Sequence, residues 1–273
     1  MKRLRAADVK RAVNAAGRAL TAVLDMRHKP IGPDMLNSAG SVSAEWYVET
    51  LWHYLAKREL LQGVSRFDVE FKQPARLADK QLHFTLPHPG ADHLVMDFQV
   101  MRTPHGAAKA ETVPVAHIAI HRGTHRRRQG VAPEPPAHPY GIEIRRRNLN
   151  ASRQVSWHTL VSVIMDVARR GAQFADARID QVDHHLLYIV PRFSFTPLGV
   201  AAAQDNLFIY PEFTLQQPWA RGKTSATARV VFWAVANEAP WPIAESVVTV
   251  VRTSLVDGVR RPVDENGVAK AKS

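Results

Sequence analysis

Two side chains of opposite acid–base character stand one helical turn apart near the start of the chain. Glu49 and His53 would share one face of a helix, where they could act as a general acid and a general base. The spacing also fits a structural pair, in which the two side chains hydrogen-bond to each other in a core or lie at a partly solvated edge. His158, near the start of a second helical pattern, has the same two interpretations.

Two serines stand directly before helical patterns. Ser43 and Ser156 have the residue type preferred at an N-cap, because a serine hydroxyl accepts a backbone N–H. Neither lies in a Gly-x-Ser-x-Gly turn, and the sequence implies no His/Asp partner for either, so a nucleophilic role is the weaker interpretation. We expect both serines to be N-caps.

Several chemistries are excluded or disfavoured by composition. The chain has no cysteine, which excludes disulfides, a thiol nucleophile and cysteine-ligated zinc. Its 13 histidines form no convincing metal site, because pairs such as His184 and His185 lack a carboxylate at ligand spacing. A phosphate-cradling glycine-rich loop and the signatures of nucleic-acid-binding modules are also missing. We therefore expect no metal and no nucleic-acid partner.

The net charge is strongly positive. The sequence carries 36 Lys and Arg against 25 Asp and Glu, a formal charge of +11. Such an excess attracts an anionic partner, although an arginine-rich composition unrelated to binding gives the same sign. The densest basic positions form two triplets: Arg126, Arg127 and Arg128, and Arg145, Arg146 and Arg147.

Three stretches place apolar residues at helical spacing. Residues 5–25 form an amphipathic pattern, whereas residues 44–61 are apolar most of the way round and residues 157–173 give a third helical pattern. A helix that is apolar on most sides is usually wrapped by other structure. We therefore expect the helix at 44–61 to be covered by a sheet.

Strand patterns accompany the last two helices. The first set covers 64–71, 81–86, 93–101 and 113–121, and the second covers 141–147, 186–195, 207–215, 226–234 and 246–253. The proline-rich, basic stretch between the sets is typical of a linker. We therefore divide the chain into an N-terminal amphipathic helix at 1–29, a first repeat at 30–125, a linker at 126–139, a second repeat at 140–256 and a disordered tail at 257–273.

Short motifs recur together with this order of elements. Leu36-Asn37 and Leu149-Asn150 are each followed, at the same distance, by Val-Ser directly before a helix. Further matches in the same order are Arg66-Phe67 with Arg192-Phe193, and Ala110–Val113 with Ala244–Val247. We expect an internal duplication, in which two helix-plus-sheet units bury their apolar faces together.

A long apolar helix cradled by an antiparallel sheet, occurring twice, resembles the double form of the hotdog fold. Many hotdog thioesterases of the 4-hydroxybenzoyl-CoA type carry Asp-x-x-Gly-His-Val-Asn just before the central helix. The segments Asn37–Ser43 and Arg147–Ser156 resemble this motif, and Asp166–Arg169 stands where the family often has Glu-Glu-Ala-Arg. The resemblance implies an α+β tandem hotdog, each repeat a long central helix wrapped by an antiparallel sheet.

The resemblance also implies an enzyme that processes acyl thioesters of coenzyme A (CoA) or acyl carrier protein (ACP), most simply a thioesterase. It implies no cofactor beyond the CoA or phosphopantetheine of the substrate. The family's carboxylate position holds Asn37 in one repeat and Asn150 in the other, and an amide cannot act as a base. An asparagine can orient water or donate to a thioester oxygen, and the helix N-terminus behind it can stabilise negative charge.

A substitute base is then expected from the helices. Glu49 or Asp166 is the candidate, with His53 and His158 as further catalytic candidates. Substrate contacts are expected from the residues around the two asparagines: Gly40, Ser41, Val42, Ser43, Gln154, Val155 and Ser156. The arginine triplets would meet the phosphates of CoA or an acidic carrier helix, unless they are a solvated charge run. The asparagines, too, could be simple turn residues.

Two other functions stay open. One is a dehydratase or an acyltransferase/decarboxylase of polyketide or fatty-acid metabolism on the same fold. The other is a non-catalytic acyl-binding or scaffold protein, which both Asp-to-Asn departures favour.

No apolar run reaches the roughly 18 residues of a membrane helix, and no signal core follows the basic N-terminus. We expect a cytoplasmic protein without a membrane partner, with homo-oligomerisation left open.

Overall fold

The computed structural model describes most of the chain with gaps. The described residues are 26–37, 40–57, 60–85, 94–103, 109–123, 141–150, 152–175, 186–203, 207–217, 219, 224–236, 240–256 and 259–263. They form two compact units. Unit 1 comprises residues 1–42 and 72–117, and unit 2 comprises residues 43–71 and 118–273.

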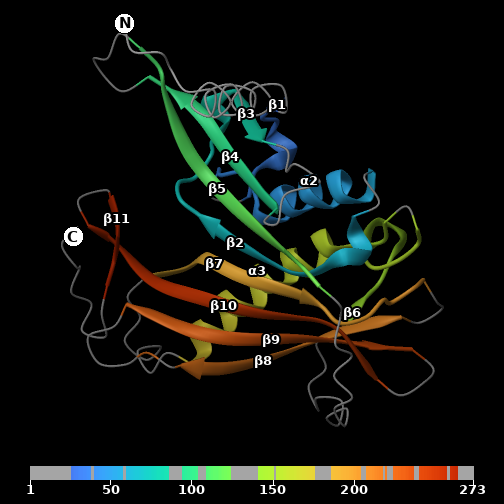
Figure 1. Ribbon diagram of the computed structural model, residues 1–273. Coiled ribbons are helices and arrows are strands. Elements are labelled where there is room, and N and C mark those ends of the chain that lie inside the picture. The colour runs from blue at the N-terminus through green and yellow to red at the C-terminus, as the bar shows by residue number, and fades with distance from the viewer. Residues whose placement is uncertain are drawn as a thin grey trace, which may run out of the picture. The chain divides into compact units, whose positions relative to one another are not determined.

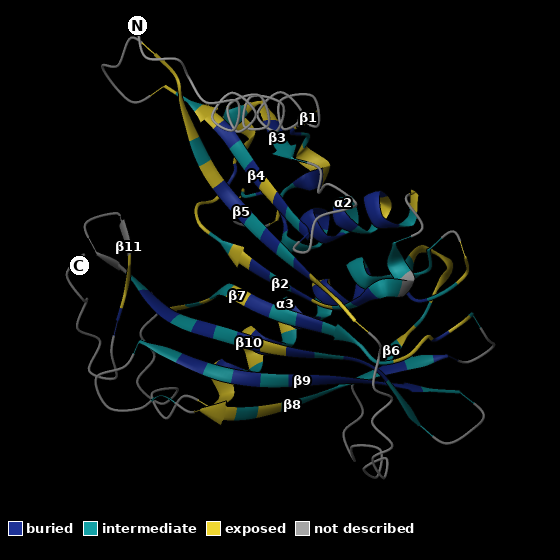
Figure 2. Cartoon of the chain, in the orientation of Figure 1, coloured by how far each residue is buried: buried dark blue, intermediate teal, exposed yellow. Residues whose placement is uncertain are grey.

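Unit 1 is an antiparallel sheet with short connecting turns. Its strands are β1 (Met26–Pro30), β3 (Gln81–Thr85), β4 (Leu94–Arg102) and the first part of β5 (Glu111–Arg122), in the order β1-β3-β4-β5. Along β4, Leu94, Met96, Phe98 and Val100 are buried and alternate with more exposed residues (Figure 2). This period of two places one apolar face of the sheet in the core of the unit.

A buried ion pair fixes the turn before β3. Asp79, in the 3-10 turn Leu77–Asp79, accepts hydrogen bonds from Arg102 Nε at 2.7 Å and Arg102 Nη2 at 2.8 Å, and one from the Arg76 N–H at 2.7 Å. The bonds from Arg102 hold the pKa of Asp79 below its usual value and outweigh the opposing effect of burial. The carboxylate therefore stays charged in the folded protein.

Unit 2 is a larger antiparallel sheet with two helices. Its strands run in the order β2-β7-β10-β9-β8-β6, and β11 pairs with β10. The bounds are β2 (Val64–Phe71), β6 (Ile142–Glu143), β7 (Leu187–Pro197), β8 (Phe208–Gln217), β9 (Ser225–Val235), β10 (Trp241–Val256) and β11 (Val259–Pro262).

The two helices of unit 2 pack against each other. Helix α3 (Trp157–Ala175) lies along one face of the β7-β10-β9-β8 sheet and also contacts α2 (Ala44–Lys57) (Figure 1). Phe67 and Phe195 stack there with ring centroids 4.9 Å apart. A Cβ on Gly171 would lie 2.8 Å from the ring of Phe213, so this glycine lets α3 approach β8 closely.

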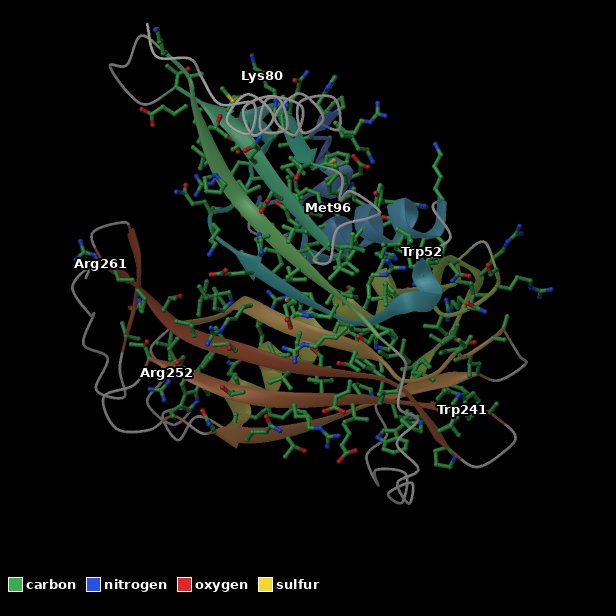
Figure 3. All side chains as sticks on the ribbon, viewed as in Figure 1. Trp52, Lys80, Met96, Trp241, Arg252 and Arg261 are labelled. Carbon is green, nitrogen blue, oxygen red and sulfur yellow. The ribbon has the colours of Figure 1, made fainter. Side chains whose placement is uncertain are left out.

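Arg252 is a charged residue inside unit 2. Its side chain, on β10, is 1% exposed, and its guanidinium lies 4.2 Å from the ring centroid of Trp219 (Figure 3). A guanidinium over an indole face gains a cation–π attraction that offsets part of its desolvation.

The expected elements are found with several differences. The strand expected at 64–71 is confirmed, but the helix expected at 44–61 ends at Lys57, and only Ile142–Glu143 of 141–147 form a strand. The tail expected to be disordered from 257 onward contains β11, whose pairing with β10 satisfies its backbone groups. The helix predicted at 5–25 lies outside the described residues, whereas residues 26–29 of the same expected segment belong to β1.

No helix in the described parts of the chain has the length and apolarity needed to cross a membrane.

Candidate functional site

A tight turn in unit 2 positions Asn150. The Asn150 N–H donates to the Gln154 carbonyl at 2.8 Å, and the Arg153 N–H donates to the Asn150 carbonyl at 3.0 Å. The side-chain oxygen Oδ1 accepts from the backbone N–H groups of Ser152 at 2.9 Å and Gln154 at 3.0 Å. Only an oxygen can accept these two bonds, so the turn fixes the orientation of the amide.

The orientation of this amide has a chemical consequence. With Oδ1 occupied, the NH₂ group of Asn150 points away from the turn, and it has no hydrogen-bond partner among the described residues. Asn150 therefore has the turn role that the sequence left open, and the same bonds leave its two donors available to a ligand.

The loop after β7 is hydrogen-bonded to this turn. The Val155 N–H donates to the Ala201 carbonyl at 2.9 Å, and the Ala203 N–H donates to the Arg153 carbonyl at 2.7 Å. Arg153 has a φ of 57°, in the left-handed region that costs most residues other than glycine free energy. These bonds to the loop hold the strained backbone in place.

The N-terminus of α3 follows directly. Ser156 Oγ accepts the Thr159 N–H at 3.2 Å, which confirms the N-cap predicted for Ser156. The backbone N–H groups of Trp157 and His158, in the first turn, have no partner among the described residues. For Ser43, before α2, no side-chain hydrogen bond occurs within the described part of the chain, so the predicted cap is absent there.

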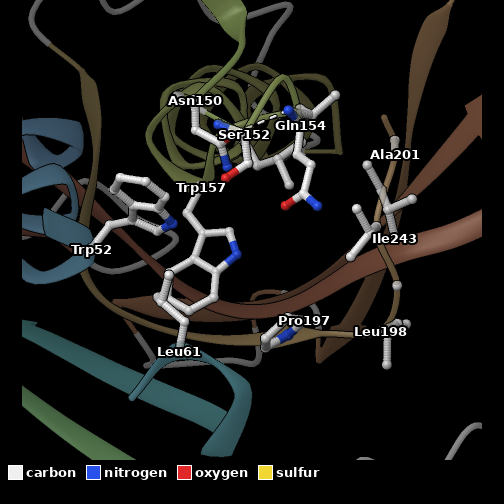
Figure 4. Close-up of a pocket in the computed structure, with 14 residues that line it drawn as sticks. Trp52, Leu61, Asn150, Ser152, Gln154, Trp157, Pro197, Leu198, Ala201 and Ile243 are labelled. Carbon is white, nitrogen blue, oxygen red and sulfur yellow. Dashed lines mark hydrogen bonds between the residues drawn. The ribbon is translucent and has the colours of Figure 1, made fainter. Parts of the chain in front are cut away.

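A cavity of about 940 Å³ opens beside the Asn150 turn, entirely within unit 2 (Figure 4). Its polar side is formed by Asn150, Ser152 and Gln154. The remaining lining residues are mostly apolar and come from α2, the start of α3, the loop after β7 and β10: Trp52, Leu61, Val155, Trp157, Leu160, Pro197, Leu198, Gly199, Val200, Ala201 and Ile243. The cavity thus exposes polar and apolar surface in similar proportion.

The cavity has no ionisable lining. None of the described residues that line it is Asp, Glu, His, Lys or Arg. Among the described residues there is also no group of three His, Cys, Asp or Glu that could hold a metal ion. The arrangement can therefore bind and polarise a neutral group, whereas proton transfer has to involve water or the ligand itself.

The expected acid–base residues lie elsewhere. His53 Nε2 and Glu49 Oε1 are 3.5 Å apart, with both side chains largely exposed, which fits the interpretation as a solvated pair. Asp166 pairs with Arg170 at 3.1 Å on an exposed face of α3. His158 Nδ1 lies 3.4 Å from Ser156 Oγ beside the helix start. None of the four lines the cavity.

Unit 1 contains a turn of the same construction. The Asn37 N–H donates to the Ser41 carbonyl at 2.8 Å, and Asn37 Oδ1 accepts the Ser41 N–H at 3.2 Å. Gly40, with a φ of 71°, stands where unit 2 has Arg153. Val42 and Ser43 are buried after this turn, and the described cavity includes none of Asn37, Gly40, Ser41, Val42 or Ser43.

Basic residues flank the Asn150 turn. Arg145, Arg146, Arg147 and Arg153 are exposed, and Arg145 pairs with Glu143 at 3.0 Å. The other three form no ion pair within the described residues. The triplet Arg126, Arg127 and Arg128 lies outside the described residues.

Sequence reasoning located part of this site and missed the rest. Of the cavity residues it proposed Asn150, Gln154 and Val155, which belong to the motif before α3. Trp52 and Trp157 were interpreted only as helix residues, and the segment Pro197–Ala201 had no motif. The one available signal was the position of Trp157 directly after the motif.

Comparisons with known proteins support the fold. No protein-family model matches the sequence, and no curated protein matches it. Among solved structures, the acyl-CoA thioesterase II TesB2 from Mycobacterium marinum aligns with 86% of this chain and 95% of its own, at 10% identity and a TM-score of 0.52. A tesB protein from Mycobacterium avium subs paratuberculosis aligns over 86% and 98%, at 12% identity and the same TM-score.

A third solved structure aligns with the chain at comparable identity and coverage. The putative oleoyl thioesterase from Lactobacillus plantarum aligns with 83% of this chain and 95% of its own, at 8% identity and a TM-score of 0.50. At such identities the likeness concerns the fold alone, and the chain shares the fold of these three proteins. The narrower 4-hydroxybenzoyl-CoA type remains a resemblance of motifs.

Proposed function

We propose that unit 2 binds an acyl thioester in the cavity beside Asn150 and polarises its carbonyl, promoting hydrolysis. The observation that carries the proposal is the amide of Asn150, whose oxygen is held by two backbone N–H groups while its NH₂ donors remain available at a cavity that also has apolar side chains in its lining. A thioester needs this combination, because its carbonyl oxygen accepts hydrogen bonds and its acyl chain is apolar.

These donors act as an oxyanion site in this proposal. The Asn150 amide and the first N–H groups of α3 come from one short segment, and donors fixed before the reaction stabilise the charge that develops on the carbonyl oxygen. The positive end of the helix dipole adds to this effect.

Hydrolysis in this site uses water as the nucleophile. The water oxygen bonds to the carbonyl carbon, the C–S bond breaks, and the thiolate takes up a proton from solvent as the water loses one. Because the described lining lacks a carboxylate and an imidazole, polarisation has to supply most of the acceleration. We therefore expect turnover well below that of a site with a base.

The alternative of acyl binding without turnover rests on the same lack of ionisable lining. A dehydratase has less support, since removing and adding protons requires an acid and a base. Binding and turnover must therefore be measured separately.

The carrier of the acyl group is CoA or ACP in this proposal. Arg146, Arg147 and Arg153, without carboxylate partners among the described residues, offer the charge that phosphates would meet. Replacing these three residues by Ser should weaken binding of acyl-CoA and leave binding of acyl-pantetheine, which has no phosphate, unchanged. Equal weakening of both ligands would contradict this role.

The internal duplication is part of the proposal. It is supported by the shared bonds of the Asn37 and Asn150 turns, and by the 3-10 turns Pro33–Met35 and Arg146–Asn148 that precede them. Unit 2 is the working copy, because its turn lines the described cavity.

One experiment tests the function. Calorimetric titration with a CoA analogue whose thioester sulfur is replaced by CH₂ measures binding, and thiol release from the matching thioester measures turnover. Binding with slow turnover supports the thioesterase, and binding without turnover identifies an acyl-binding protein. Absence of binding across a panel of chain lengths would refute the proposal.

A further inference from the structure

The cavity offers more hydrogen-bond donors than one thioester carbonyl can use. Beyond Asn150, the side-chain amide of Gln154 and the indole N–H groups of Trp52 and Trp157 have no partner among the described residues. Figure 4 shows the Gln154 amide and the Trp157 nitrogen directed toward the open middle of the cavity. A ligand that fills this space meets several donors along one wall.

Trp157 is a fixed donor. Its ring lies 5.4 Å from that of Phe67 and 5.9 Å from that of Phe195, centroid to centroid, so two buried aromatic residues hold the indole. The packing leaves Nε1 on the cavity side (Figure 4). Because the ring cannot easily turn, this N–H stays in the cavity whatever ligand enters.

A saturated acyl chain would cover this donor without pairing it. A donor that loses its water and gains no acceptor costs about 1–3 kcal/mol, while a ligand oxygen in the same place removes that cost. The cavity would then discriminate against a plain hydrocarbon lying against Trp157. It favours an acyl group that carries an acceptor there.

An uncharged acceptor suits the lining better than a carboxylate. None of the described lining residues is Lys, Arg or His, so a carboxylate entering the cavity would meet no counter-charge there. A keto oxygen meets both requirements, because it accepts two hydrogen bonds and carries no charge.

We propose that unit 2 prefers acyl thioesters with a second carbonyl close to the first, as in a 3-oxoacyl group, and that Trp157 Nε1 donates to that second oxygen. The inference rests on the proposed function, since it concerns the acyl group bound in the same cavity. Trp157 is then a specificity-determining residue in direct contact with the substrate.

The test uses two matched ligands. The CH₂-for-sulfur CoA analogues of the 3-oxooctanoyl and octanoyl thioesters differ only in the keto oxygen, and calorimetry gives the Kd of each. We expect the wild-type protein to prefer the 3-oxo analogue by roughly tenfold, the effect of one good hydrogen bond. Trp157→Phe, which keeps an aromatic ring against Phe67 and Phe195, should reduce the preference to near unity.

The control variant is Trp52→Phe, which removes the other indole N–H and should retain the preference. Retention of the preference in Trp157→Phe would overturn the assignment to Trp157, whatever the result for Trp52→Phe. Equal affinity of the wild-type protein for both analogues would overturn the inference and leave the proposed function standing. Failure of both analogues to bind would refute the proposed function and the inference with it. The wild-type comparison holds even if a variant folds poorly.

Discussion

At the scale of single residues, the amide of Asn150 decides what the cavity can do. Replacing it by Asp keeps one oxygen between the N–H groups of Ser152 and Gln154, and the second oxygen takes the place of the NH₂ group. That second oxygen is a carboxylate oxygen beside the cavity, able to accept a proton from water. We expect Asn150→Asp to raise thioester hydrolysis in a thiol-release assay.

The companion change is Asn150→Ala, which removes the oriented donors. Turnover should fall by roughly tenfold to a thousandfold, as it does when one oxyanion donor is lost. Asn37→Asp and Asn37→Ala are the matched controls, because Asn37 stands in a turn of the same construction that does not line the described cavity. Equal responses at the two positions would contradict the assignment of the site to unit 2.

Asp79 supports a prediction on pH. Its folded pKa lies below the unfolded value because Arg102 stabilises the charged form, so the stability it provides is present above the unfolded pKa, near 3.8, and is lost as the pH falls through the folded pKa. Asp79→Asn should lower the free energy of unfolding by about 1–3 kcal/mol at pH 7, since it removes the charged partner of Arg102, which is partly exposed and keeps its bonds to Gln73 and Pro74. Urea denaturation should show this difference shrinking toward pH 3.

Asp68 supplies the comparison for Asp79. It pairs with Arg66 at 2.6 Å and with His121 at 2.7 Å, but all three side chains are at least one third exposed. Asp68→Asn should therefore cost about 1 kcal/mol or less at any pH. A cost as large as that of Asp79→Asn would show that burial is not the deciding factor.

The residues of the cavity could be predicted only where they share a motif. Asn150 and Gln154 stand in a segment that the sequence repeats, so their type and spacing identified them. Ile243 and Ala201 carry no chemistry of their own and come from segments far along the chain. Their place depends on how β7 and β10 pair, which one-dimensional spacing does not specify.

At the scale of elements, the start of α3 depends on its cap. Ser156→Ala removes the acceptor of the Thr159 N–H and should lower the free energy of unfolding of unit 2 by about 1 kcal/mol. Ser43→Ala is the matched control before α2, where the described structure has no side-chain cap bond, and it should change stability much less. Thermal denaturation of the two variants measures the difference, and equal losses would count against the cap.

The bounds of β2 were predicted well, whereas the start of β10, a strand that contains a proline, was not. Apolar and polar residues alternate over 67–71, and the strand expected at 64–71 has the bounds of β2. β10 begins at Trp241, five residues before the expected start at 246, and includes Pro242. The register of β10 with β9 shifts between Pro242 and Ala244, which accommodates a residue without an N–H.

At the scale of the whole molecule, ligand binding should be confined to one unit. The CH₂-for-sulfur analogue contacts only cavity residues of unit 2 in this proposal, so hydrogen exchange should slow at residues 152–160 and 197–201. Exchange in β4, residues 94–102 of unit 1, should remain unchanged. Mass spectrometry of peptides from both units measures the two responses together, and slowing confined to β4 would move the site to unit 1.

The fold itself was predictable because it depends on pattern more than on identity. A helix that is apolar on most sides and a sheet with one apolar face can be specified by many sequences, so 10–12% identity suffices for the shared fold. Function depends on a few positions, and this chain has amides where the motif it resembles has carboxylates. The fold and the function of this chain therefore depend on different features of its sequence.

The fixed amide of Asn150 also has a consequence for how the protein ages. Asparagine deamidates slowly in solution, and the normally linked product is aspartate. At this position the product would keep both backbone hydrogen bonds and gain a carboxylate beside the cavity. A stored preparation would then acquire hydrolytic activity without any change of gene, so freshly purified protein of verified intact mass gives the true activity of the amide form.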